Sequence, residues 1–134
     1  MSVLTLKFVI MIIIVAHGIG HVMPIFAAFG LKMSLHHSLH SWAFSNFIGE
    51  KPTTIIAVIY WLLPLIGFIV AGLGMYDILI SFNSWQQVAV FSAVFSSIGL
   101  VFFWNAFPFL IPNKIGVIVV NVLVFYYYNR IELG

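Results

Sequence analysis

Five histidines are the side chains of this 134-residue sequence with the clearest capacity for chemistry. His17 and His21 are four residues apart, as are His36 and His40, and His37 lies beside the second pair. On a helix this spacing places two imidazoles on one face, where they could hold one metal ion. If the segment with the second group folds back over the first, the two groups could meet. The sequence therefore suggests a transition metal bound by these histidines, without any cysteine.

Other catalytic chemistries lack the residues that they need. The only aspartate, Asp77, belongs to the end of the molecule opposite His21, which excludes a Ser/His/Asp triad. The other carboxylates, Glu50 and Glu132, are too far apart to form an acid/base pair. A bis-histidine haem would need histidines on two spanning helices, and only the first apolar run has any. We therefore predict no catalytic residues.

A second candidate site is a layer of polar side chains at one depth. Counting about 1.5 Å per residue from one end, His21, Tyr60 and Asn121 lie roughly 10–12 Å inside their apolar runs. Asn105 lies slightly nearer that end, and His17 lies one turn deeper. Polar groups among spanning helices must find partners, so we expect these five to face one another. The layer is either a hydrogen-bonded clamp between helices or a small cavity for a ligand, metal or proton.

The elements that must position these residues are membrane-spanning helices. The chain is 63% hydrophobic and 6% charged, with a mean hydropathy of +1.19, and a soluble domain of this size cannot bury so much apolar surface. The five cations are too few and too scattered for a nucleic-acid surface. We predict a single all-α integral membrane domain, an antiparallel bundle of four transmembrane helices. The spans are expected at residues 3–29, 53–76, 85–107 and 113–128.

The first loop is predicted to carry a short interfacial helix at residues 34–48. Ser34 could cap it, and an apolar face would follow at helical spacing. The residues of that face are Leu35, Leu39, Trp42 and Ala43.

Small residues form stripes along the predicted spans, which indicates close helix packing. The expected contact residues are Gly20, Gly67, Ala71, Gly74, Ser92, Ser96 and Gly99. The cations favour the side of the first and third loops by three (Lys32, Lys51 and Lys114) to two (Lys7 and Arg130), which predicts both termini outside the cytoplasm.

Short motifs also carry a resemblance. They are His17-Gly18-x-x-His21, then Trp61-Leu62 and Ala71-Gly72, and finally Lys114-x-Gly116 followed by Asn121. This set resembles small four-helix membrane proteins of bacteria and archaea that are loosely DoxX-like. The resemblance implies a four-helix bundle in a prokaryotic cell membrane and an association with membrane oxidase complexes. The additional histidines in a long first loop depart from that pattern, and a shared fold does not define an activity.

Three functions are compatible with these features. The leading hypothesis is a non-catalytic small subunit or accessory of a larger, respiratory or oxidative, membrane complex. Its partners would be the lipid bilayer and other membrane subunits or copies of itself, with no nucleic acid. The alternatives are a histidine-based metal-binding or redox membrane protein, and a small oligomeric transporter or channel that uses the polar layer as its path.

Overall fold

The apolar runs of the sequence form long helices in the computed structural model, which describes residues 2–132. Helices are the only regular secondary structure in this part of the chain, which has no strands. Four of its helical segments are long and apolar enough to cross a membrane, as the composition predicts. The elements are α1 (Val3–Gly20), α2 (Val22–Ala28), α3 (Ser45–Ile48), α4 (Glu50–Gly74), η1 (Phe82–Ser84), α5 (Trp85–Phe102), η2 (Trp104–Ala106), η3 (Leu110–Lys114) and α6 (Ile115–Glu132).

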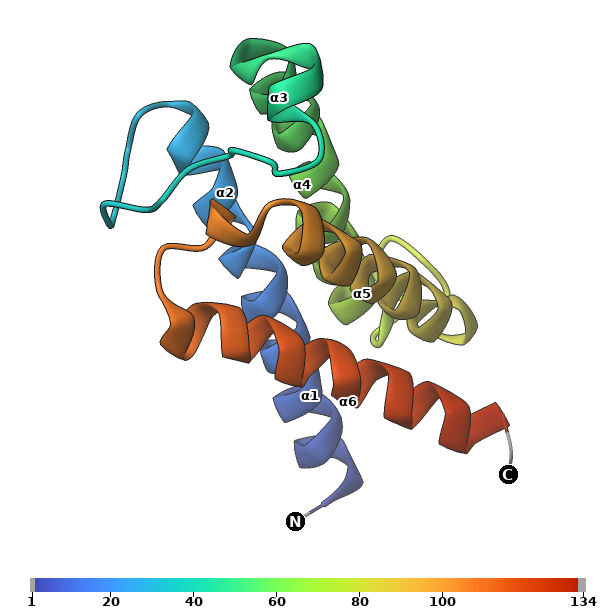
Figure 1. Cartoon of the computed structure of the whole chain (residues 1–134). Helices are drawn as coiled ribbons and strands as arrows, with labels where there is room; N and C mark the ends of the chain where they lie inside the picture. The colour runs from blue at the N-terminus through green and yellow to red at the C-terminus, as the bar shows by residue number, and fades with distance from the viewer. Residues whose placement is uncertain (1, 133–134) are drawn as a thin grey trace.

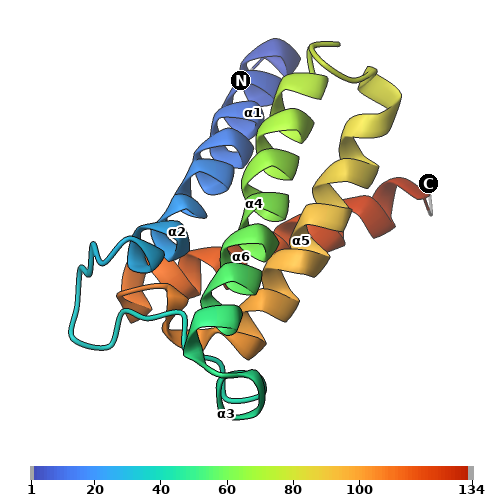
Figure 2. The same ribbon diagram turned by 90° about the horizontal axis from the view of Figure 1, so that it is seen from above.

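The helix α4 is the centre of the bundle, with α1 on one side and α5 on the other (Figures 1 and 2). Successive long helices run in opposite directions, and α6 crosses the others (Figure 2). Its main neighbour is α5, and it makes few contacts with α1. Two of the outer helices, α1 and α6, are therefore the least enclosed.

Proline determines where two of the helices break. The first span is interrupted at His21, between α1 and α2, because Pro24 has no N–H to donate to the preceding turn. The helix α5 ends at Phe102, five residues before the predicted end at 107. The backbone continues as η2 toward Pro108, since the residues before a proline are disfavoured in α-helix.

Glycine permits close approach between the helices at several points. A Cβ on Gly67 would meet the Ser92 side chain, and one on Gly99 would lie 2.8 Å from Trp61. Both glycines belong to the predicted stripes, whereas the space around Gly20 is open within 4 Å. Its neighbour Gly18 makes the contact with α4 instead, against Phe68. Among the other predicted contact residues, Ala71, Gly74, Ser92 and Ser96 are buried.

Two apolar clusters form the core, one toward each end of the bundle. The cluster near the first loop contains Leu39, Ala57, Trp61, Leu100, Phe103, Ala106, Phe107 and Val117. The cluster toward the chain termini contains Ile14, Phe68, Ala71, Met75, Ala89 and Ala93.

The predicted interfacial helix at residues 34–48 is wrong for most of its length, because only α3 is helical there. Leu35 is 97% exposed while Leu39 is buried, so the predicted apolar face does not exist. The loop instead folds back over the end of the bundle in an irregular path (Figure 1). Tertiary hydrogen bonds replace a helical ladder here, since Ser38 N–H donates to the Asn105 carbonyl and Trp42 Nε1 donates to the Val101 carbonyl.

Candidate functional site

The candidate site is a closed ring of hydrogen bonds that joins α1, α5 and α6. His21 lies at the break between α1 and α2, and its Nδ1 is 2.9 Å from the carbonyl oxygen of His17. A carbonyl can only accept, so Nδ1 carries the proton of the neutral ring and Nε2 is an acceptor. The Ser96 hydroxyl, 2.8 Å from this Nε2, must therefore donate to it. One backbone carbonyl thus sets the direction of these two hydrogen bonds.

Asn121 on α6 closes the ring. Its Nδ2 donates to Ser96 Oγ at 3.0 Å and to Ser97 Oγ at 3.1 Å. Its Oδ1 lies 3.3 Å from His17 Nε2, which donates to it. Each bond then has one donor and one acceptor, running from His17 through Asn121 and Ser96 to His21 and back to the His17 carbonyl. We call these four side chains, His17, His21, Ser96 and Asn121, the polar ring.

Aromatic side chains surround the polar ring. His17 and His21 lie edge to face, with centroids 4.8 Å apart, and Phe68 is 4.6 Å from His17. Trp61 and Phe107 each lie 5.7 Å from His21. His21 and Ser96 are fully buried and Asn121 almost so. Hydrogen bonds in such an apolar setting are stronger than in water, and a group left without a partner is correspondingly costly.

Trp61 differs from the polar ring in having a buried polar atom without a hydrogen-bond partner. Within residues 2–132, its Nε1 is the one buried side-chain polar atom without a hydrogen-bond partner. An unpaired donor costs about 1–3 kcal/mol. Full burial of a tryptophan against Phe107 and Gly99 outweighs this cost, since truncating such a side chain typically loses about 3–5 kcal/mol.

The structure brings together three of the five residues of the predicted polar layer, namely His17, His21 and Asn121. Tyr60 lies elsewhere on α4, where its hydroxyl donates to the Phe95 carbonyl at 2.8 Å. Asn105 lies in η2, and its backbone carbonyl holds the first loop. From the sequence we predict Ser96 only as a helix-packing residue. Nothing in the residues around it indicates that its hydroxyl bonds to His21 and Asn121.

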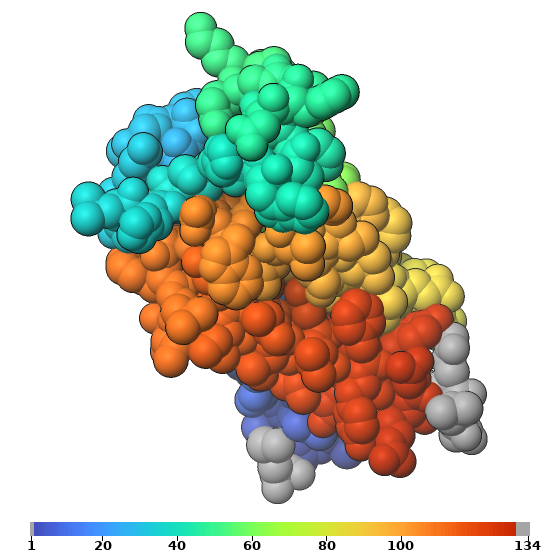
Figure 3. Space-filling view, in the orientation of Figure 1, coloured from blue at the N-terminus to red at the C-terminus, as the bar shows by residue number. Residues whose placement is uncertain are grey.

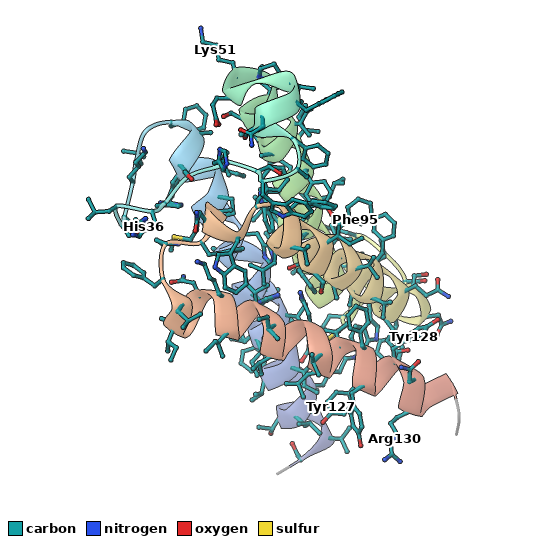
Figure 4. All side chains as sticks on the ribbon, in the orientation of Figure 1. His36, Lys51, Phe95, Tyr127, Tyr128 and Arg130 are labelled. Carbon is teal, nitrogen blue, oxygen red and sulfur yellow. The ribbon has the colours of Figure 1, made fainter. Side chains whose placement is uncertain are left out.

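The remaining histidines lie in separate places. His36 is exposed at the edge of the molecule (Figure 4). His37 is buried, where its Nδ1 accepts from the Met33 N–H and its Nε2 is about equally far from the Met23 and Ala106 carbonyls. His40 pairs with Glu50 at 2.7 Å on the surface. Across residues 2–132, no three histidine or carboxylate side chains gather at distances suited to a metal ion. The single five-histidine site suggested by the spacing is therefore not assembled.

Two clefts lie beside α6, and one of them reaches the polar ring. One, of about 280 Å³, lies between α5 and α6 and reaches Ser97 and Asn121. The other, of about 340 Å³, is almost wholly apolar and lies between α1, α5 and α6, toward the chain termini. Gln86, Tyr127 and Tyr128 provide its polar groups. We call the first the α5–α6 cleft and the second the terminal groove.

Comparison with known proteins adds no further constraint, because no protein-family model, curated protein or solved structure matches this chain.

Proposed function

We propose that this protein is a non-catalytic subunit of a larger membrane complex and that a transmembrane helix of a partner packs into its terminal groove. The observation that carries the proposal is the low enclosure of the outer helices. Only 11% of the most apolar stretch of the first span and 17% of that of the last are buried, against 33% for the two inner helices. Helices that bury so little of their surface are available to a partner.

The shape of the terminal groove supports a helical partner. Ile13 on α1 and Leu123 on α6 are each about half exposed and line opposite sides of it, while Ile14 and Met75 form its buried floor. Side chains of a third helix could interdigitate with both walls. Tyr127 and Tyr128 lie toward the end of α6 (Figure 4), where aromatic residues typically meet the membrane surface.

The polar ring fits this function as a clamp. It ties α6 to α1 and α5 by way of Asn121, which lies two residues before the groove residue Leu123 on α6. Every hydrogen bond in it has both partners, which suits a fixed structural joint. We infer that the ring sets the angle at which α6 leaves α1 and thereby holds the groove open for the partner.

Site-specific photo-crosslinking tests the proposal directly. The sequence has no cysteine, so Leu123→Cys provides a unique attachment point for a benzophenone in the groove. Ile59→Cys is the control, because Ile59 is also an exposed apolar residue, at 61% against 47% for Leu123, and lies on α4 outside the groove. In native membranes we expect one discrete protein adduct from Leu123→Cys and none from Ile59→Cys. Equal adducts at both positions, or only lipid adducts at both, would contradict the proposal.

The size of the adduct identifies the partner. Two differently tagged copies expressed together distinguish a second copy of this chain from another protein. A product that carries both tags would make the groove a self-association surface and would overturn the hetero-complex. A stable monomer in mild detergent, with no crosslink, would also contradict the proposed hetero-complex.

The membrane in which the protein lies and its orientation there are also part of this proposal. We place it in a prokaryotic cell membrane as an antiparallel four-helix bundle. The distribution of its lysines and its arginine favours both termini outside the cytoplasm. The DoxX-like resemblance and the oxidase association stay hypotheses. The metal-binding and transport alternatives draw less support from the geometry, since the histidines are dispersed and the polar ring is closed. Metal analysis of the purified protein, with His21→Ala as the comparison, tests the metal alternative.

A further inference from the structure

The α5–α6 cleft lies between two neighbouring helices. Its lining on α5 forms one stripe at Ser97, Leu100 and Val101, and Trp104 at the start of η2 extends this wall. Its lining on α6 forms a second stripe, at Ile118, Asn121, Val122 and Phe125. Apart from Ser97 and Asn121, the walls are apolar or aromatic, and Asn121 uses its donors and its acceptor within the hydrogen-bond network already described.

A lysine at the end of η3, with no carboxylate partner among the described residues, extends the line of cleft residues on α6 by one helical turn. Lys114, the last residue of η3, is four residues before Ile118, and the residue as a whole is 8% exposed. Its Nζ lies 4.6 Å from the ring centroid of Trp104, which also lines the cleft. In the described part of the chain the one ion pair is His40 with Glu50, so no carboxylate neutralises this lysine. A largely buried cation is costly unless an anion accompanies it.

We propose that the α5–α6 cleft binds one long-chain carboxylate drawn from the bilayer. Its carboxylate pairs with Lys114 beside Trp104, and its hydrocarbon chain lies along Ile118, Val122 and Phe125. The helix rises about 16 Å from Lys114 to Phe125, at ~1.5 Å per residue, which gives the chain a long apolar path. Trp104 is amphipathic and 45% exposed, which suits a position where a lipid headgroup meets the acyl region.

The dimensions of the cleft favour this ligand over larger ones. A partner helix is about 10–12 Å across with its side chains and cannot enter a space of about 280 Å³ between two packed helices. A phospholipid carries two chains, whereas the cleft follows a single pair of stripes. One cation at one end matches one carboxylate. The site faces a different side of α6 from the terminal groove, so ligand binding here does not depend on the proposed partner.

Native mass spectrometry of the detergent-purified protein tests the proposal with three probes. Palmitate is the expected ligand, hexadecanol has the same chain without the charge, and dipalmitoyl phosphatidylglycerol is the anionic phospholipid. We expect one palmitate per protein, with hexadecanol at least tenfold weaker, because a charge-assisted hydrogen bond is stronger than one between a charged group and a neutral hydroxyl. Equal binding of palmitate and hexadecanol, or stronger binding of the phospholipid, would overturn the proposal.

Two pairs of variants locate the site. Lys114→Gln is expected to remove the preference for palmitate over hexadecanol, while Lys51→Gln, at the exposed start of α4 (Figure 4), is expected to keep it. Ile118→Trp fills the cleft and should reduce palmitate binding at least tenfold. Val119→Trp places the same bulk on an exposed position of α6 outside the cleft and should leave binding within twofold. Undiminished binding in both Lys114→Gln and Ile118→Trp would place the ligand elsewhere.

Discussion

The two ends of this molecule solve the problem of helix association differently. At the loop end, polar side chains hold the first loop over the bundle, and the polar ring lies just inside it. At the terminal end, α1 and α6 diverge, and an apolar groove lies between them. Viewed from one face, α6 and α5 lie in front, and the first loop covers one end (Figure 3).

The difference shows what each kind of contact can do in a membrane. Lipid solvates apolar side chains as well as another helix does, so apolar faces alone provide little reason for α1 and α6 to close together. Directed hydrogen bonds between helices do provide one, because buried polar groups without partners are costly. The polar end is therefore the structural joint, and the partner helix that we propose would need close side-chain packing to bind at the apolar end.

The largest effect is expected from breaking the polar end at His37. His37→Ala leaves the Met33 N–H and two backbone carbonyls without this partner, which predicts a loss of about 2–4 kcal/mol in unfolding free energy. Denaturant titration in detergent measures it, and trypsin cleavage at exposed Lys32 should become faster as the loop opens. His36→Ala, at an exposed neighbour, should change stability by less than about 0.5 kcal/mol. Similar losses in both variants would contradict the assigned role of His37.

The second-largest loss of stability is expected from breaking the polar ring. Asn121→Leu removes three hydrogen bonds, each expected to contribute about 0.6–1 kcal/mol among membrane helices, and predicts a loss of about 2–3 kcal/mol. The exposed Asn129→Leu is the matched control on the same helix and should be nearly neutral. If the ring holds the groove open, Asn121→Leu also reduces the crosslink at Leu123. An unchanged crosslink in a destabilised variant would separate the ring from the groove.

A smaller effect is expected where the helices approach most closely. Gly67→Ala places a Cβ against the Ser92 side chain, and the required shift predicts a loss of about 1–3 kcal/mol. Gly116→Ala is the comparison, because nothing lies within 4 Å of its Cβ position. There the removal of a helical glycine is expected to stabilise the protein by about 0.5–1 kcal/mol. Thermal unfolding of both variants decides the sign of each change.

The smallest effect is expected in the terminal groove. Leu123→Ala shortens a half-exposed side chain that contacts lipid or a partner, so the stability of the isolated protein should change by less than about 0.5 kcal/mol. Co-purification of the partner from native membranes should fall with the same substitution. A large loss of stability in the isolated protein would show that the groove belongs to the core of the bundle.

Part of the candidate site could be predicted from residue positions alone. The spacing of His17 and His21 places them on one helical face, and counting residues brings Asn121 to a similar depth. Tyr60 satisfies the same depth criterion and still lies outside the ring, because depth along the helix does not specify which way a side chain points. His37 could not be identified either, since its partners are backbone carbonyls of Met23 and Ala106, which any residue could provide.

The sequence by itself determined the helical class and the number of helices long and apolar enough to span a membrane, because the cost of exposing backbone and charge to lipid depends on local composition. It did not determine the path of the first loop, where an amphipathic pattern predicted a helix and tertiary hydrogen bonds produced an irregular segment. Only the tertiary structure decided that Ser96 joins two histidines and an asparagine, that the other histidines lie apart, and that α6 leaves α1. These features depend on how the helices rotate about their axes, which side-chain packing across the whole bundle sets.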